Sequence, residues 1–99
     1  MSIGYLYILE CSDGTYYTGS TKDFSRRFEQ HQAGEGSLYT RKRLPLKVLY
    51  VEEFPAINEA FYREKQIQGW SRAKKEALIQ GRRNCLHKLS IAYRDKDCI

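Results

Sequence analysis

The sequence has few of the residues that build zinc sites and disulfide frameworks. Three cysteines occur among 99 residues, Cys11, Cys85 and Cys98, and no C-x-x-C pair is present. An odd number of cysteines at these spacings argues against both a structural zinc site and a network of disulfides. Free thiols are typical of a reducing compartment, so we expect a cytoplasmic protein.

Long hydrophobic runs, repeats and low-complexity segments are also absent from the sequence. The first ten residues, MSIGYLYILE, lack a basic stretch, and their apolar run is too short for a signal peptide or a membrane span. No membrane association is therefore expected. The length of 99 residues favours a single domain with one hydrophobic core.

Positive charge is in excess. Lys and Arg number 17 against 12 Asp and Glu, which gives a formal net charge of +5. A basic balance favours polyanionic partners, with nucleic acid first among them. A soluble protein that is merely basic is the alternative, because net charge carries information about association and not about fold.

The first half of the chain alternates strand-like and helix-like segments. Residues 5–10 and 15–20 are rich in aromatic, apolar and β-branched side chains, and the D-G dipeptide between them predicts a hairpin turn. The segment KDFSRRFEQHQAG is predicted to be a helix that Asp23 caps and Gly34 ends. The polar and basic segment that follows, GEGSLYTRKRLP, is predicted to be a loop.

The only two prolines mark boundaries in the second half. Pro45 precedes a third predicted strand, LKVLYVEEF, and Pro55 separates that strand from a helix within residues 56–70. Ser71 is predicted to cap a last helix, RAKKEALIQ, that ends at Gly81.

This order of elements, β-β-α-β-α-α, predicts the fold class. It indicates a small α/β (α+β) domain with a mostly antiparallel three-stranded sheet flanked by helices. We expect the domain to occupy residues 1–81 and a partly helical C-terminal tail to occupy residues 82–99.

A glutamate lies on the apolar face of the predicted helix within residues 56–70. At about 100° per residue the apolar side chains fall on one arc: Ile57, Ala60, Phe61 and Ile67. Glu64 falls in the middle of this arc, whereas Glu59 points away from it. A salt bridge at the edge of the core would explain this position, and so would a functional site.

The first predicted helix repeats this feature. Phe24 and Phe28 define its apolar face, and Arg27 and His31 flank that face, four residues apart. Arg27 would have an ordinary structural role if its stem packed on the core while its head stayed in water. His31 would have one if it were a packed or capping histidine. Three polar side chains at inward positions of two helices favour a shared site.

Tyrosines add to this pattern, since eight of them occur in the chain. Tyr5 and Tyr7 share one face of the first predicted strand, and Tyr17 and Gly19 share one face of the second. Ordinary strand packing would account for the tyrosines. A glycine within a strand often marks the close approach of a ligand or of another backbone segment.

These residues together resemble a known family. The motif YLY at residues 5–7, the motif YTG at residues 17–19 and the arginine eight residues after Gly19 resemble the GIY-YIG nuclease domain of excision-repair nucleases and phage homing endonucleases. The later segment EAFYREKQIQGWSRAKKEALI is similar to small, single-domain bacterial GIY-YIG proteins, and the likeness spans about residues 5–79. Tyr5 and Leu6 depart from the glycine and isoleucine of the first motif.

The resemblance implies a GIY-YIG endonuclease fold and a role for each matching residue. Tyr7 and Tyr17 match the two motif tyrosines, Arg27 matches the family's helix arginine, and His31 stands where members have tyrosine or histidine. Glu64 matches the glutamate that holds a single divalent metal, Mg²⁺ or Mn²⁺. The implied function is metal-dependent phosphodiester hydrolysis on DNA by a structure-directed endonuclease, in the setting of DNA repair or recombination.

In that chemistry Arg27 would stabilise charge on the phosphate, and the base would be Tyr17, Tyr7 or His31, which the sequence leaves open. Lys22 and Gly19 are expected to lie at the substrate. The TRKR segment would grip backbone phosphates, unless it is simply a solvated basic loop: Thr40, Arg41, Lys42 and Arg43.

Two other functions stay open. A non-catalytic nucleic-acid-binding module would keep the fold without cleavage. An adaptor would use the apolar and basic segment CLHKLSIAY, in the tail, to bind a protein partner. A monomer is expected for each of these functions, the nuclease included.

Overall fold

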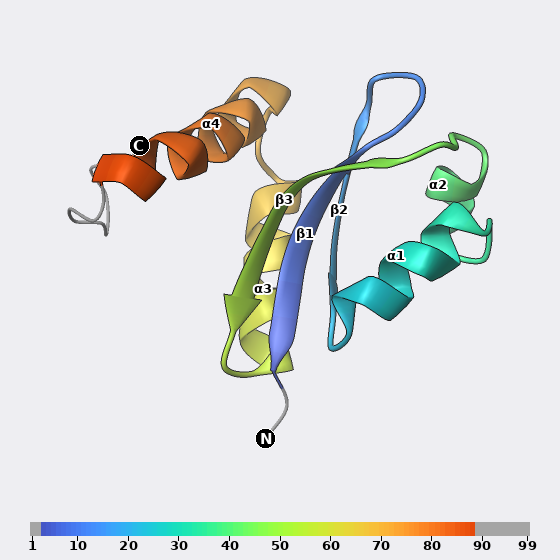
Figure 1. Cartoon of the computed structure of the whole chain (residues 1–99), viewed down its shortest axis with the longest axis horizontal. Helices are drawn as coiled ribbons and strands as arrows, with labels where there is room; N and C mark the ends of the chain where they lie inside the picture. Colours follow the sequence, from blue (N-terminus) through green and yellow to red (C-terminus); the bar gives the residue numbers. More distant parts are fainter. Residues whose placement is uncertain (1–2, 89–99) are drawn as a thin grey trace. The chain divides into compact units, whose positions relative to one another are not determined.

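The computed structural model describes residues 3–88, with side chains described for residues 3–81. It contains three strands and four helices in the order β-β-α-α-β-α-α (Figure 1). Their bounds are β1 Gly4–Glu10, β2 Tyr16–Thr21, α1 Phe24–Gln32, α2 Leu38–Arg41, β3 Lys47–Phe54, α3 Ile57–Gln68 and α4 Arg72–Lys88. The chain forms two compact units, the first ending at Gly69 and the second beginning at Trp70. The expected division at residue 81 stays a prediction.

The strands form one antiparallel three-stranded sheet, as the sequence predicts, and their order in it is β2-β1-β3. β1 is the central strand, and its residues from Leu6 to Leu9 are at most 1% exposed. Such a continuous apolar run is typical of a strand that is covered on both faces. Because β1 pairs with both neighbours, β2 keeps a free edge.

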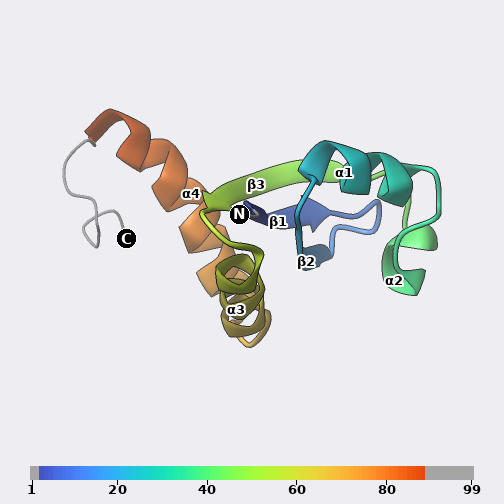
Figure 2. The ribbon, with the colours of Figure 1, turned by 90° about the horizontal axis from the view of Figure 1, so that it is seen from below.

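Helices cover both faces of this sheet. Figure 2 shows α1 on one side of the strands and α3 on the other. Side chains alternate between the two faces along a strand. Tyr7 accordingly packs against Phe24 of α1, whereas a Cβ atom on Gly4 would come within 2.5 Å of the Ile57 Cα atom of α3. Glycine at position 4 therefore allows β1 and α3 to pack closely.

Two predicted helix starts are confirmed. Asp23 caps α1, since its Oδ1 atom accepts a hydrogen bond of 3.2 Å from the Arg26 N–H. The Ser71 Oγ atom accepts one of 3.2 Å from the Lys74 N–H at the start of α4. Gly34, one residue beyond the α1 C-cap, has φ of 81°, which glycine adopts most readily.

Two predicted boundaries are wrong. The expected loop after Gly34 contains the short helix α2, which Ser37 caps. One helical turn is too short to show a 3.6-residue apolar period, so the sequence pattern misses it. Gly81 does not end the last helix, because α4 continues to Lys88; an interior glycine costs a helix only about 1 kcal/mol.

The predicted tail falls partly on residues 82–88, which are helical, and partly on residues 89–99, which lie outside the described residues. Its role as a docking segment stays a prediction. No helix in the described part of the chain is long and apolar enough to cross a membrane.

Candidate active site

The centre of the candidate site is a buried pair from β1 and α1. The Tyr7 Oη atom lies 3.0 Å from His31 Nε2. Tyr7 is 1% exposed and His31 is fully buried, and their rings meet edge to face with centroids 5.9 Å apart. The inward position predicted for His31 is therefore observed, and its partner is a motif tyrosine.

Gly19 makes this arrangement sterically possible. It lies opposite Tyr7 in the sheet register. A Cβ atom at position 19 would lie 2.5 Å from Tyr7 Oη and 2.6 Å from Tyr7 Cζ. The group that approaches Gly19 is therefore the Tyr7 side chain, and not the ligand or backbone segment that the sequence suggested. Gly19 is itself buried, and its expected place at the substrate stays a prediction.

The other nitrogen of His31 is also engaged. His31 Nδ1 lies 2.9 Å from Thr40 Oγ1 of α2, and this hydroxyl donates to the Ser37 carbonyl oxygen at 3.2 Å. A Cβ atom on Gly36 would clash with the His31 ring, so glycine lets the backbone cover the imidazole. Thr40 is fully buried. This burial does not favour the role of phosphate contact expected for Thr40, which stays a prediction.

Burial sets the protonation of the pair. It raises the pKa of Tyr7 well above the ordinary value, and the charges of Tyr17 and Glu64 raise this pKa further, against the opposing charge of Arg27. Burial and the Arg27 charge lower the pKa of His31. At neutral pH Tyr7 is therefore a neutral phenol and His31 a neutral imidazole.

Tyr17 is the more accessible of the two motif tyrosines. It is half-buried on β2. Its ring meets His31 edge to face at a centroid distance of 5.4 Å and stacks on Tyr39 at 6.1 Å. Tyr7 and Tyr17 lie 6.4 Å apart between centroids. Of the three side chains considered as a base, Tyr17 alone has appreciable exposure.

Glu64 lies on α3, on the face of the sheet opposite α1, and two hydrogen bonds hold its carboxylate. Its Oε1 atom accepts a hydrogen bond from Ser20 Oγ at 2.5 Å, and its Oε2 atom accepts one from Gln68 Nε2 at 2.7 Å. Gln68 also donates to the Thr18 carbonyl oxygen at 3.4 Å. Both partners of the carboxylate are neutral, so among the residues whose side chains are described Glu64 does not make the salt bridge that was its alternative explanation.

An open hollow of about 480 Å³ lies at the free edge of β2. The hollow is lined by residues of β2, of α1, of the segment that joins β2 to α1, and of α3. Among them are Ser20, Lys22, Arg26, Arg27, Ile57 and Phe61. Ser20 both lines the hollow and donates to Glu64. The hollow thus brings two predicted basic residues, Lys22 and Arg27, to the place where the carboxylate is held.

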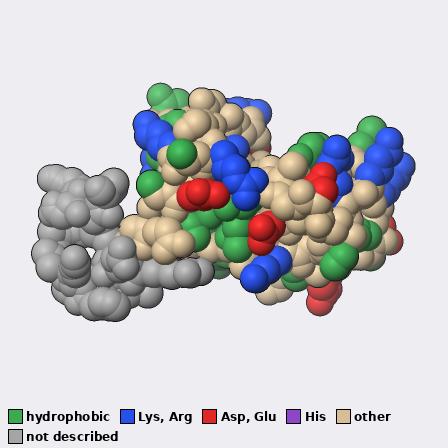
Figure 3. Space-filling view, turned by 90° about the horizontal axis from the view of Figure 1, so that it is seen from above, with side chains coloured by type: hydrophobic (Ala, Val, Ile, Leu, Met, Phe, Trp, Pro, Cys, Tyr) green, Lys and Arg blue, Asp and Glu red, His purple; other side chains and the backbone are tan. Residues whose placement is uncertain are grey.

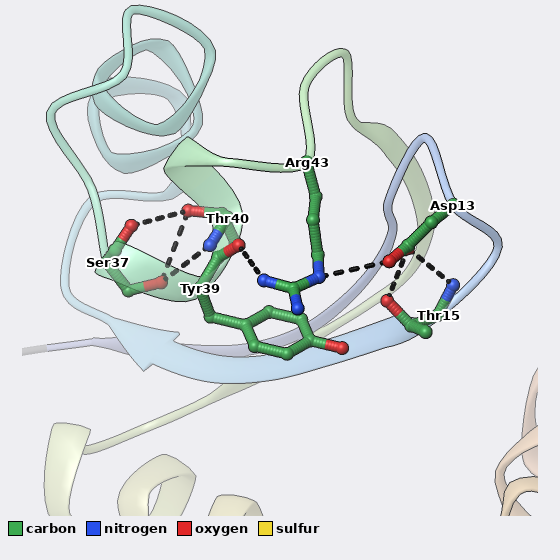
Figure 4. A network of polar contacts seen from close by, with 6 residues as sticks. All are labelled: Asp13, Thr15, Ser37, Tyr39, Thr40 and Arg43. Carbon is green, nitrogen blue, oxygen red and sulfur yellow. Dashed lines mark hydrogen bonds and ion pairs between the residues drawn. The ribbon is translucent and has the colours of Figure 1, made fainter.

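Arg43 has a structural position instead of an open one. Its Nε atom donates to Asp13 Oδ2 at 3.0 Å and its Nη1 atom to the Tyr39 carbonyl oxygen at 2.9 Å (Figure 4). Its guanidinium also lies 3.8 Å from the Tyr39 ring centroid. Arg43 therefore ties α2 to the hairpin turn. Arg41 and Lys42 are exposed, and they are the residues of the TRKR segment that remain open to solvent.

Charge on the surface is mixed. On the face that Figure 3 shows, Lys and Arg side chains are spread over several areas, with Asp and Glu side chains between them.

The carboxylate of Glu64 is a chemically suitable ligand for a divalent cation. Within the described residues no group of three or more His, Cys, Asp or Glu side chains gathers to hold a metal. Mg²⁺ does not need such a group, because it keeps several waters and binds one or two carboxylates plus substrate phosphate. Each carboxylate oxygen of Glu64 uses one hydrogen bond, which leaves lone pairs for an ion.

The family is shown by comparison with known proteins. The GIY-YIG catalytic domain matches residues 3–77, about three quarters of the chain. The chain therefore belongs to the GIY-YIG family.

Within this family it is similar to small UPF0213 proteins of archaea and bacteria. The UPF0213 protein of Halobacterium salinarum is 51% identical over 75 residues, which cover 76% of this chain and 97% of the relative. That of Cupriavidus pinatubonensis is 52% identical over 74 residues, which cover 75% and 82%.

Solved structures support the fold. The solution NMR structure of the UPF0213 protein from Bacillus halodurans has 44% identity and a TM-score of 0.53 over 79% of this chain and 83% of that one. A solution NMR structure from E. faecalis has 32% identity and a TM-score of 0.57 over 81% and 85%. The three-stranded antiparallel sheet with helices is thus the fold of this family.

Proposed function

We propose that this protein is a structure-directed DNA endonuclease that hydrolyses phosphodiester bonds with one Mg²⁺ or Mn²⁺ ion. The observation that carries the proposal is the hollow at the free edge of β2. Arg27 and Lys22 line it, and its Ser20 holds the carboxylate of Glu64. A guanidinium, an ammonium and a carboxylate at one open edge match the charges that a phosphodiester and a divalent ion need. The proposal sets this activity in the cytoplasm, in DNA repair or recombination.

Each residue has a distinct part in this proposal. Arg27 donates to the non-bridging oxygens of the phosphate, where its planar fork can bind two of them at once. Glu64 holds the ion, which when bound supplies Lewis-acid stabilisation at the phosphate. Lys22, Arg41 and Lys42 are exposed and contact neighbouring phosphates.

Tyr17 positions the attacking water in this proposal, since it is half-buried at the site whereas Tyr7 and His31 are closed off from solvent. In the hydrolytic step the water oxygen bonds to phosphorus and the bond from phosphorus to the leaving oxygen breaks. One proton of the attacking water is released to solvent water beside Tyr17, and the leaving oxygen takes a proton from solvent.

The role of Arg27 can be tested with a pair of substitutions. The full chain is incubated with nicked, flapped and branched DNA in Mg²⁺ or Mn²⁺, with EDTA as the blank. Arg27→Ala should lower the cleavage rate by about 10²–10³, the usual effect of losing one transition-state donor. Arg27→Lys keeps the charge but loses the fork, so it should restore only part of the rate. Equal rates for all three proteins would contradict the proposal.

A non-catalytic binding module is the second candidate. Ser20 and Gln68 each donate a hydrogen bond to one oxygen of the Glu64 carboxylate. A metal ion would have to share the carboxylate with these two donors, which favours the binding module. Salt-dependent DNA binding without cleavage, unchanged by Glu64→Ala, would support this function over hydrolysis.

A further inference from the structure

Thr40 reaches the candidate site through a chain of buried hydrogen bonds. Thr40 Oγ1 lies 2.9 Å from His31 Nδ1, and His31 Nε2 lies 3.0 Å from Tyr7 Oη. All three side chains are at most 1% exposed, so water does not compete for these contacts. The imidazole of His31 therefore links the Thr40 hydroxyl to the Tyr7 hydroxyl by two hydrogen bonds.

The direction of each hydrogen bond follows from the last acceptor in the chain. The Ser37 carbonyl oxygen can only accept, and the Thr40 hydroxyl donates to it at 3.2 Å. With its one hydrogen given to this carbonyl, Thr40 Oγ1 accepts from the Nδ1–H of His31, and the Ser37 hydroxyl, 3.2 Å away, can donate to it as well. A neutral imidazole with its proton on Nδ1 has a lone pair on Nε2, which accepts from the Tyr7 O–H.

We propose that Thr40 is a positioning residue that fixes His31 as the Nδ1–H tautomer and thereby aims the Tyr7 hydroxyl hydrogen at His31. This inference rests on the proposed nuclease function for its effect on rate, but its structural part does not. With the Tyr7 hydrogen directed inward, the lone pairs of its oxygen stay available to Arg27 or to a water of the site. The opposite tautomer would place an N–H against Tyr7 and occupy one of those lone pairs.

The surroundings hold Thr40 in place for this task. Ser37 Oγ accepts from the Thr40 N–H at 3.2 Å as the cap of α2. Arg43 anchors the same segment to Asp13 at 3.0 Å (Figure 4). The hydroxyl of Thr40 is therefore fixed relative to His31 by contacts that do not involve His31.

The tautomer can be read directly. Ring ¹⁵N chemical shifts of His31 are recorded on the full chain at pH 7.5, in a His87→Gln background because the sequence has two histidines. Thr40→Val has nearly the same shape and lacks the hydroxyl, whereas Thr40→Ser keeps the hydroxyl. We expect the Nδ1–H tautomer in the parent and in Thr40→Ser, and loss of that preference in Thr40→Val. Thr40→Ala takes its place if the valine variant does not fold.

Measuring the cleavage rate as well as the tautomer separates the claim that Thr40 sets the His31 tautomer from the claim that this tautomer affects catalysis. In the DNA cleavage assay Thr40→Val should lower kcat about tenfold with KM little changed, the size of one lost positioning hydrogen bond, and Thr40→Ser should restore it. Thr18→Val is the matched control, since Thr18 is a second buried threonine whose hydroxyl does not contact His31.

An unchanged His31 tautomer in Thr40→Val overturns the inference, whatever the rates. A changed tautomer with kcat equal to that of Thr40→Ser overturns the link to catalysis. An inactive parent protein counts against the proposed function alone, because the chemical shifts still decide whether Thr40 sets the tautomer.

Discussion

Ser20 Oγ donates a hydrogen bond to Glu64 Oε1 across 2.5 Å, which joins the free edge strand β2 to helix α3. This contact explains why a carboxylate stands on the apolar side of α3. It also fixes the direction in which the carboxylate faces, beside the hollow that Arg27 lines. The arrangement makes Ser20 the support of the proposed metal ligand.

Ser20→Ala should weaken binding of Mn²⁺. Residues that orient a metal ligand typically contribute about 10–100-fold to metal affinity, and Ser20→Thr keeps the hydroxyl and should stay near the parent value. Titration of the full chain with Mn²⁺, followed by the loss of the free-ion EPR signal, measures the dissociation constant. An unchanged constant in Ser20→Ala would show that this hydrogen bond does not serve a metal.

Gly19→Ala should destabilise the fold. The new Cβ atom would lie 2.5 Å from Tyr7 Oη, and overpacking of this kind costs about 1–3 kcal/mol. Gly69→Ala is the control, because its Cβ atom would meet its nearest neighbour at 3.6 Å. Urea unfolding followed by circular dichroism gives both values. Equal stability of the two variants would mean that the packing of the Tyr7 ring does not require a glycine at position 19.

Thr18→Val should stabilise the protein. Thr18 is 4% exposed, and its Oγ1 atom has no hydrogen-bond partner among the described residues. A buried hydroxyl without a partner costs about 1–3 kcal/mol, and valine removes it while keeping nearly the same shape. The free energy of unfolding in urea should therefore rise by about 1 kcal/mol. A fall would indicate that the hydroxyl has a partner, such as a buried water.

Stability should decrease on acidification because of His31. Burial lowers the pKa of His31 in the folded protein below its ordinary value of 6.5. The unfolded chain thus binds a proton at a higher pH than the folded chain does. The contribution of His31 is fully present above pH 6.5 and is lost as the pH falls toward the folded pKa. Urea midpoints between pH 7.5 and 5 should fall less in His31→Gln than in the parent, and parallel curves would contradict this assignment.

Several parts of the site follow from local sequence. Helical periodicity places Glu64 and His31 on inward faces, and the structure places both there. The capping pattern at Asp23 and the paired strands before it also follow from neighbouring residues. These features are predictable because they depend on contacts within one helix or one hairpin.

Other parts depend on contacts that local patterns do not carry. Glycine is needed at position 19 because the sheet register sets it opposite Tyr7. Thr40 is buried because it lies in α2, which is one turn long and too short to show an apolar periodicity in the sequence. Ser37 and Gly36, which support Thr40 and cover His31, were not identified from the sequence. Ser37 is a preferred N-cap residue, because its hydroxyl can accept from the backbone N–H three residues on, and it is the signal that would have indicated α2.

Cleavage of a flapped DNA in Mg²⁺ by Glu64→Ala and by Glu59→Ala tests the central claim most directly. Both residues lie on α3, but Glu64 is held at the hollow by Ser20, whereas Glu59 is exposed. The account predicts cleavage by the parent and by Glu59→Ala, and loss of cleavage by about 10² or more in Glu64→Ala. Cleavage by Glu64→Ala at the parent rate, or no cleavage by the parent protein, would contradict it.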